Sequence, residues 1–168
     1  FWGDNIDREL NPNEVVKELI ENKVVGVANG RAEFGPRALG NRSLLADPRY
    51  NIKDKVNKIK RRQKFRPFAP AILEEEYEKY FDGYGNEFMQ FVSDAKHDYK
   101  SVIHADGTSR VQIVKDDGSN LRKILECWYE VTKCPMLLNT SLNIKGQPIV
   151  NTWEDALQFQ SKYGVLVL

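Results

Sequence analysis

The sequence predicts an α/β fold in which helices flank a layered sheet within one domain. Short apolar, β-branched runs alternate along the chain with segments whose apolar residues recur at helical spacing, and this alternation is typical of layered α/β sheets. The chain has 168 residues, 41% of them hydrophobic, which suffices for one sizeable core. Because no segment approaches the roughly 18 consecutive apolar residues of a membrane-spanning helix, we expect a soluble protein with no membrane partner.

Polar caps, glycines and prolines mark the boundaries of the predicted elements. The predicted elements are, in order, a helix capped by Asn13, strands over 24–28 and 43–46, a helix over 51–62, an extended stretch over 67–73, a helix over 74–81, strands over 89–92, 101–103 and 111–114, a helix over 119–133, a strand over 135–138, a helix over 152–164 and a strand over 165–168. The turn-rich link at 104–107 favours a hairpin between the strands over 101–103 and 111–114.

Charge and cysteine content limit the class of protein. The net charge of +1 argues against a globally basic nucleic-acid binder, although residues 53–66 form a local basic block. Cys127 and Cys134 are too few for a disulfide framework and have no metal-ligand neighbours, so we expect reduced thiols, a cytoplasmic location and no metal site. The chain starts at Phe1 and stops inside an apolar run at 165–168, so we expect a piece of a longer polypeptide.

The first candidate for ligand binding is the loop over residues 30–43, which lies between two predicted strands. It contains three glycines together with Arg31, Arg37 and Arg42. Glycines let backbone N–H groups approach an anion, and arginine offers a planar, always charged fork to phosphate oxygens. The loop is not a Walker P-loop, because no Gly-Lys-Ser/Thr closes it. The alternative is an ordinary surface loop with solvated arginines.

The second candidate is the segment over residues 60–70, where a basic helix end meets a Pro-Phe-Ala-Pro stretch. Proline restricts the backbone and can hold Lys60, Lys64 and Arg66 at a set spacing toward one ligand. The alternative is a solvated basic face.

The third candidate is the segment over residues 139–148, directly after a predicted buried strand. Ligands on α/β sheets favour the carboxyl ends of strands, and Thr140, Ser141 and Asn143 offer hydroxyl and amide groups to phosphate or carbonyl oxygens. Arg110 would add a cation if its strand lies beside this one. The alternative is a polar turn whose side chains cap their own backbone.

Signatures of several other enzyme classes are missing from the sequence. It has no Gly-x-Ser-x-Gly elbow and no His-Glu-x-x-His, and His97 and His104 are isolated histidines. Candidate residues that are mostly Arg, Lys, Ser and Asn suit phosphoryl or nucleotidyl transfer, in which catalysis is mainly positioning and charge neutralisation.

Four motifs taken together resemble one known family. They are GRAEFGPRALGNRSLLADPR, KFRPFAPAIL, HADGTSRVQ and LLNTSLNIKGQPIV, in this order between about Asn22 and Trp153. The chain is similar to the C-terminal domain of the carbamoyltransferase family that includes nodulation-protein-U-like and antibiotic-tailoring enzymes. The resemblance implies a YrdC-like fold, in which a twisted mixed sheet with flanking helices surrounds a basic concave cavity.

The resemblance also implies an activity. In this family ATP, with Mg²⁺, and carbamoyl phosphate give a carbamoyladenylate, and pyrophosphate leaves. An N-terminal domain of the sugar-kinase/actin type, which carries a metal centre, then passes the carbamoyl group to a hydroxyl of a small acceptor. We therefore expect residues 1–168 to be the C-terminal domain of an ATP-dependent O-carbamoyltransferase, with that N-terminal domain as its partner.

The resemblance also assigns roles to individual residues. The family's phosphate- and nucleotide-binding positions fall on Arg37, Lys60, Arg66, Arg110, Ser141 and Asn143. We expect catalytic roles for Lys60, Arg66 and Ser141, and substrate or nucleotide binding by Arg37, Arg42, Arg110, Thr140 and Asn143. The chain departs from the family pattern at Ala32, Gln63, Leu142, Lys145 and Gln147.

Two other functions are compatible with the sequence. The basic block over 53–66 could follow an RNA backbone, because related YrdC-like domains act on or near RNA, although the near-neutral net charge makes nucleic acid a poor partner. The domain could also be catalytically silent alone and form only half of an interdomain site.

Overall fold

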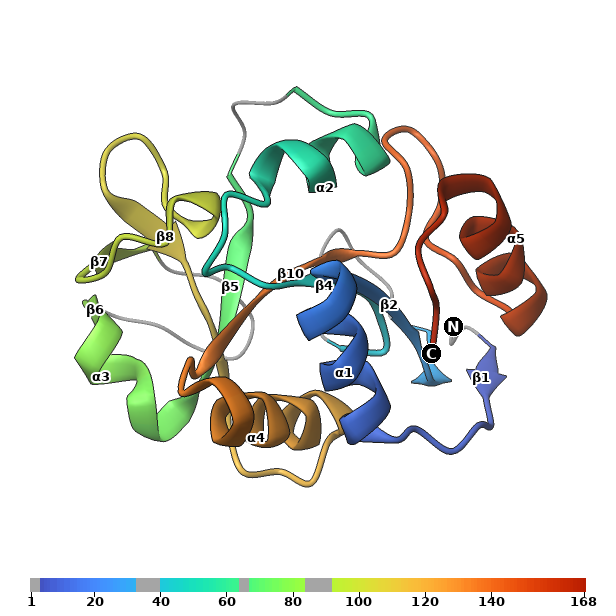
Figure 1. Ribbon diagram of the computed structural model, residues 1–168, viewed down its shortest axis with the longest axis horizontal. Coiled ribbons are helices and arrows are strands. Elements are labelled where there is room, and N and C mark those ends of the chain that lie inside the picture. Colours follow the sequence, from blue (N-terminus) through green and yellow to red (C-terminus); the bar gives the residue numbers. More distant parts are fainter. Residues whose placement is uncertain (1–3, 33–39, 64–66, 84–91) are drawn as a thin grey trace.

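The structure, a computed structural model, describes residues 4–32, 40–63, 67–83 and 92–168. Figure 1 shows the arrangement of its helices and strands. In chain order they are β1 (Asn5–Ile6), α1 (Pro12–Asn22), β2 (Val24–Ala28), β3 (Gly30–Arg31), β4 (Arg42–Ala46), α2 (Lys53–Lys60), β5 (Ala69–Leu73), the 3-10 helix η1 (Glu74–Glu76), α3 (Tyr77–Tyr80), β6 (Phe81–Asp82), β7 (Val92–Ala95), the 3-10 helix η2 (Lys100–Val102), β8 (Thr108–Arg110), β9 (Gln112–Val114), α4 (Asn120–Thr132), β10 (Met136–Ser141) and α5 (Trp153–Tyr163).

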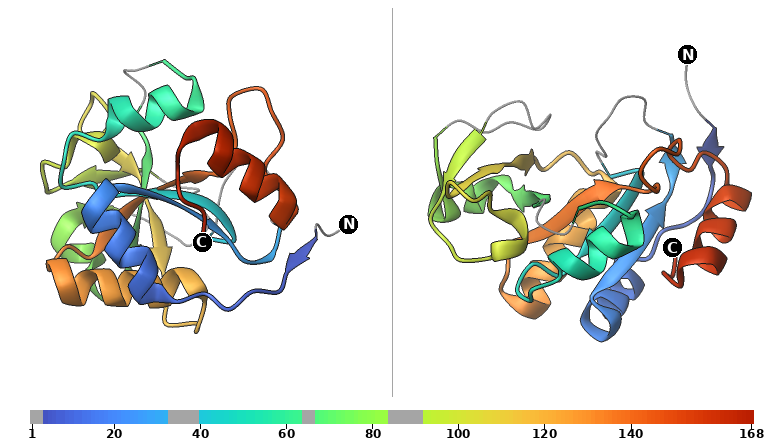
Figure 2. Two further views of the ribbon diagram at one scale, coloured as in Figure 1. Left: turned by 45° about the vertical axis from the view of Figure 1, so that its right-hand side comes forward. Right: turned by 90° about the horizontal axis from the view of Figure 1, so that it is seen from above.

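A mixed five-stranded sheet forms the centre of the molecule, with strand order β2-β4-β10-β5-β9. Neighbouring strands are antiparallel except for β5 and β9, which are parallel. The sheet is twisted, and Figure 2 shows α1, α2 and α4 on one side of it, with α5 beyond the end that carries β2. The predicted fold class, α/β with a twisted mixed sheet and flanking helices, is confirmed.

Side-chain caps define the starts of the three long helices. The side chain of Asn11, and not Asn13 as predicted, caps α1. Ser119 caps α4 as predicted, and Thr152 forms a capping box with Asp155 at the start of α5. Gly164 ends α5 in the left-handed conformation with φ 67°, a conformation that glycine adopts without steric cost.

The predicted strand over 101–103 and its hairpin with 111–114 are wrong. Residues 100–102 form η2. The Oγ of Ser101 accepts hydrogen bonds from the backbone N–H groups of Ile52 (3.1 Å) and Lys53 (3.2 Å), so the turn is fixed to the start of α2. β8 pairs with β7 in a separate three-stranded sheet, and β9 joins the central sheet beside β5. The predicted strand over 89–92 lies mostly outside the described residues, and β7 begins at Val92.

The outer edge of β2 is covered by the last residues of the chain. Val167 forms a parallel bridge with Gly26. The backbone N–H of Gly26 donates to Leu166 (2.8 Å) and that of Ala28 donates to Leu168 (2.9 Å). The predicted final strand is therefore an extended segment with a single bridge, parallel to β2.

Candidate functional site

Three predicted site residues, Lys60, Ser141 and Asn143, form one hydrogen-bonded group, here called the Lys60 cluster. The Nζ of Lys60 donates to the backbone carbonyl of Ser141 (2.6 Å), to its Oγ (3.1 Å) and to Oδ1 of Asn143 (3.1 Å). The Oγ of Ser141 also donates to Oδ1 of Asn143 (2.6 Å). The structure thus joins the second and third candidate segments at one point.

The end of α2 and the end of β10 bring the residues of this cluster together. α2 ends at Lys60 because Arg61 takes the left-handed conformation (φ 57°), and the backbone N–H of Arg61 donates to the carbonyls of Asn57 and Lys58. β10 ends at Ser141. The loop that follows returns to the helix, where the backbone N–H of Lys145 donates to the carbonyl of Lys60 (2.9 Å). Backbone hydrogen bonds therefore hold the two elements in register.

The Lys60 cluster buries a cation among neutral oxygens. Only 4% of Lys60 is exposed. Desolvation lowers the pKa of its ammonium group to about 7, and the positive charge of Arg62 acts in the same direction. The three oxygens described above belong to a carbonyl, a hydroxyl and an amide, none of which offsets the charge. A bound anion would stabilise the ammonium form, so the cluster suits phosphate or another negatively charged group.

Arg42, a predicted ligand-binding residue, is fully buried and hydrogen-bonded to backbone carbonyls. Its residue exposure is 0%. The guanidinium donates to five backbone carbonyls at 2.9–3.2 Å, those of Asp4, Asn29, Gly30, Asn41 and Asn151. Arginine has five N–H donors, and carbonyls from three separate segments occupy them. Arg42 therefore holds the N-terminal strand, the 30–43 loop and the segment before α5 together.

Of the other four predicted site residues, the two that the structure describes, Arg110 and Thr140, do not join the cluster. Arg110 is exposed on β8, in the three-stranded sheet, so its strand does not lie beside β10. Thr140 precedes Ser141 on β10, and successive side chains of a strand point to opposite faces. Arg37 and Arg66 lie outside the described residues.

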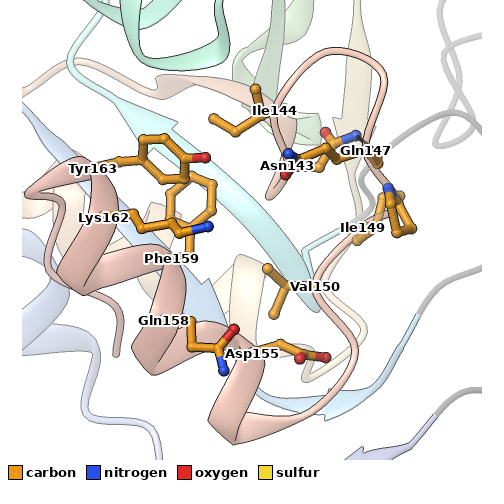
Figure 3. Close-up of a pocket in the computed structure, with 11 residues that line it drawn as sticks. Asn143, Ile144, Gln147, Ile149, Val150, Asp155, Gln158, Phe159, Lys162 and Tyr163 are labelled. Carbon is orange, nitrogen blue, oxygen red and sulfur yellow. Dashed lines mark hydrogen bonds between the residues drawn. The ribbon is translucent and has the colours of Figure 1, made fainter.

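A pocket of about 190 Å³ adjoins the Lys60 cluster. Figure 3 shows it between the loop that follows β10 and helix α5. The rings of Phe159 and Tyr163 line it from α5, and Asn143 and Gln147 line it from the loop. Asn143 therefore belongs both to the pocket and to the cluster.

The α5 side of this pocket was missed in the sequence. Phe159 and Tyr163 are four residues apart, a spacing that places two side chains on one helix face, and this was the available signal.

A buried amide pair in the central sheet was also not predicted from the sequence. Nδ2 of Asn139 donates to Oε1 of Gln112 (2.7 Å), on the same sheet as Ser141. Polar residues inside apolar strand runs were the signal for that pair.

The described residues contain neither a metal-ligand cluster nor a membrane-spanning helix. Within residues 4–32, 40–63, 67–83 and 92–168, no three His, Cys, Asp or Glu side chains gather in a way that could hold a metal ion. Across the same described ranges, no helix has both the length and the apolar character needed to cross a membrane.

Comparison with known proteins gives a family. Residues 16–168 match the family model described as carbamoyltransferase C-terminus. The chain is 38% identical to nodulation protein NolNO of Sinorhizobium fredii, over 93% of this chain and 25% of that protein. It is 34% identical to 3'-hydroxymethylcephem-O-carbamoyltransferase of Amycolatopsis lactamdurans, over 94% of this chain and 31% of that protein. The chain thus spans about a quarter to a third of the length of these curated relatives.

A solved structure has the same fold. Full-length HypF, in a phosphate- and nucleotide-bound form, superposes with a TM-score of 0.58 and 20% identity, over 96% of this chain and 21% of that one. The similarity concerns the fold and agrees with the predicted YrdC-like architecture. Because the family model covers residues 16–168 and both named relatives match over more than nine-tenths of the chain, the protein belongs to the carbamoyltransferase C-terminus family.

Proposed function

We propose that this chain is the carbamoyl-activating domain of an ATP-dependent O-carbamoyltransferase. Mg²⁺-ATP, carbamoyl phosphate and water give carbamoyladenylate, pyrophosphate and phosphate at the Lys60 cluster. A domain outside residues 1–168 then transfers the carbamoyl group to a hydroxyl of a small acceptor. Support comes from the family, from a relative named as an O-carbamoyltransferase, and from a fold shared with a protein solved with phosphate and nucleotide.

The observation that carries this proposal is the buried ammonium group of Lys60. It lies within 3.1 Å of Ser141 and Asn143, so one cation and two short polar side chains contact one another. In phosphoryl and nucleotidyl transfer, a preorganised cation stabilises the charge that develops on the phosphate oxygens. Lys60 would supply that charge, while Ser141 and Asn143 orient the ligand. Arg37 and Arg66 remain proposed members of the site.

RNA binding finds less support. An RNA-binding face needs basic side chains that point to solvent, and Lys60 is buried. Arg62 donates to Oδ1 of Asn57 (2.9 Å) and to the carbonyl of Pro67 (3.1 Å), and its guanidinium lies 4.1 Å from the centroid of the Phe68 ring. These two residues of the basic block are therefore held by contacts within the chain.

The test is a calorimetric titration of the chain with Mg²⁺-ATP, in wild type and in Lys60→Met. Loss of one charge-assisted contact costs about 1.5–3 kcal/mol, so affinity should fall roughly ten- to a hundredfold. Lys58→Met is the matched control, because Lys58 lies on the same helix and is exposed. Wild-type affinity in Lys60→Met, with normal thermal unfolding, would contradict the proposal.

A further inference from the structure

Ser101, in η2, holds both ends of the segment over residues 52–68. Its Oγ accepts hydrogen bonds from the backbone N–H groups of Ile52 (3.1 Å) and Lys53 (3.2 Å), at the start of α2. Its backbone carbonyl accepts from the backbone N–H of Phe68 (3.1 Å), which follows the basic block. Ser101 is 0% exposed, and hydrogen bonds away from water are stronger than those at the surface. One buried residue therefore fixes this segment at both of its ends.

The start of α2 depends on this distant residue. The helix has eight residues, and Ile52, at its N-cap position, makes no side-chain capping hydrogen bond. A helix of this length is marginal in isolation, and its first N–H groups have no partner within the helix. The hydroxyl of Ser101 accepts from two N–H groups at this end, as the side chain of a serine at the N-cap does in other helices.

The other end of α2 carries a group that gains free energy by moving away. Lys60 is 4% exposed, and desolvation lowers the pKa of its ammonium group to about 7. The charged form therefore favours conformations in which the ammonium reaches water. Contacts that keep α2 in place oppose this tendency. The backbone hydrogen bond from Lys145 to the carbonyl of Lys60 (2.9 Å) acts at the end of the helix, and Ser101 acts at its start.

We propose that Ser101 is a positioning residue for the reaction, because it keeps α2 formed and so holds the ammonium group of Lys60 at the end of β10. This inference rests on the proposed function, in which Lys60 stabilises the charge on the phosphate oxygens. Ser101 would act only through α2, since its buried hydroxyl bonds backbone groups over residues 50–53. η2 is itself held by β8, where the Oγ of Ser109 donates to the carbonyl of Val102.

The test follows Lys60 and α2 directly in the 168-residue chain. An NMR titration of the Lys60 side chain gives the pKa of its ammonium group, and amide hydrogen exchange reports the local opening of α2. In Ser101→Ala, the α2 amides should exchange roughly fivefold faster, the usual effect of one lost cap. The pKa of Lys60 should rise, because its ammonium reaches water more often. Calorimetric affinity for Mg²⁺-ATP should fall with it, since only the formed helix presents Lys60 to the ligand.

Ser93→Ala is the matched control. Ser93 is 2% exposed, and its Oγ forms a hydrogen bond with the hydroxyl of Tyr77 (2.6 Å), so this substitution also removes a buried hydrogen bond. Ser93 lies on β7, outside the 52–68 segment. The variant should therefore have a lower thermal midpoint while the pKa of Lys60 and the exchange of α2 relative to the central sheet stay as in the wild type.

The outcomes separate this inference from the proposed function. An unchanged pKa of Lys60 in folded Ser101→Ala would overturn the inference, as would an equal rise in Ser93→Ala. The wild type gives a test that needs no variant, because amides of Ile52 and Lys53 that exchange like unprotected ones would show that Ser101 does not hold the helix. If the pKa rises as expected but the wild type does not bind Mg²⁺-ATP, Ser101 positions Lys60 and the proposed function fails. If the wild type binds Mg²⁺-ATP and Lys60 titrates identically in Ser101→Ala, the proposed function stands and this inference fails.

Discussion

Burial of the Lys60 ammonium group raises the free energy of the folded state, and no opposite charge among its described partners offsets this penalty. This group is almost fully withdrawn from water, and its described partners are neutral oxygens. Burying a charge without an opposite charge disfavours folding, and a hydrophobic side chain of similar size would avoid that penalty. A perturbed ionisable group beside a pocket is a common property of functional sites. The buried position of Lys60 therefore supports its proposed role in ligand binding.

The pKa of Lys60 gives a pH-dependent contribution to stability. The group titrates near 10.5 in the unfolded chain and at about 7 in the folded chain. Between these values the unfolded state binds more protons, so the contribution of Lys60 to the free energy of unfolding rises with pH, by at most about 1.4 kcal/mol per pH unit. Below pH 7 the contribution is constant.

Urea unfolding of wild type and Lys60→Met at about pH 6, 7.5 and 9 measures this contribution, because the other groups cancel in the difference. The wild type should gain stability relative to Lys60→Met above pH 7. A difference that stays constant over this range would mean that Lys60 has an ordinary pKa in the folded chain.

Arg42 should be among the residues whose loss destabilises the fold most. Arg42→Ala removes donors from five buried or half-buried carbonyls and leaves a cavity, so the free energy of unfolding should fall by about 3 kcal/mol or more. Arg110→Gln, at an exposed position, should change it by less than about 0.5 kcal/mol. Chemical denaturation measures both variants, and similar small effects in both would contradict the structural role of Arg42.

At the scale of elements, α5 lines one wall of the pocket beside the Lys60 cluster, and a capping box holds its start. The Oγ1 of Thr152 accepts from the backbone N–H of Asp155 (3.1 Å), and the carboxylate of Asp155 accepts from the backbone N–H of Thr152 (3.1 Å). Thr152→Ala should therefore lower the free energy of unfolding by about 1 kcal/mol. Ser161→Ala, at an exposed position of the same helix, should leave it unchanged or slightly raise it. Equal effects of the two substitutions, measured by urea unfolding, would argue against the cap.

Elements with local signals were predictable, and elements that depend on distant partners were not. Ser119, Thr152 and Gly164 carry their boundary signals in their own side chains, and the structure confirms all three. The segment over 101–103 has the β-branched residues of a strand, yet it forms a 3-10 turn. Its conformation depends on Ser101, which binds the start of α2 about fifty residues earlier, and no local pattern reveals that contact.

At the scale of the whole molecule, the candidate site was predictable only in part. Residue types alone left each segment with a surface alternative, and it was the order of four motifs that indicated one family. The convergence of Lys60 with Ser141 and Asn143 then follows from the fold. The pocket was not predictable, because it arises where α5 packs against a loop and its walls have no shared motif. The role of Arg42 in holding three segments together was not predictable either. Its acceptors are backbone carbonyls, which every residue has and which leave no pattern in the sequence.

The C-terminal segment protects an edge of the central sheet. Val167 is 2% exposed beside Gly26, where even a Cβ atom would lie 2.9 Å from Cγ2 of Val167. Val167→Asp would bury an unpaired charge there, so the segment should detach from β2. A detached segment leaves the backbone groups of an edge strand unpaired, and such edges associate with other chains.

We therefore expect Val167→Asp to lower the thermal midpoint and to show association that increases with protein concentration. Leu166→Asp is the matched control, because Leu166 is the neighbouring residue and is 37% exposed. Its thermal unfolding and sedimentation should stay close to those of the wild type. Sedimentation velocity over a range of concentrations distinguishes the two variants, and equal behaviour would mean that the β2 edge does not depend on Val167. Since the Lys60 cluster lies at the end of β10, two strands from this edge, Val167→Asp should weaken the proposed ATP binding only under conditions that also unfold the chain.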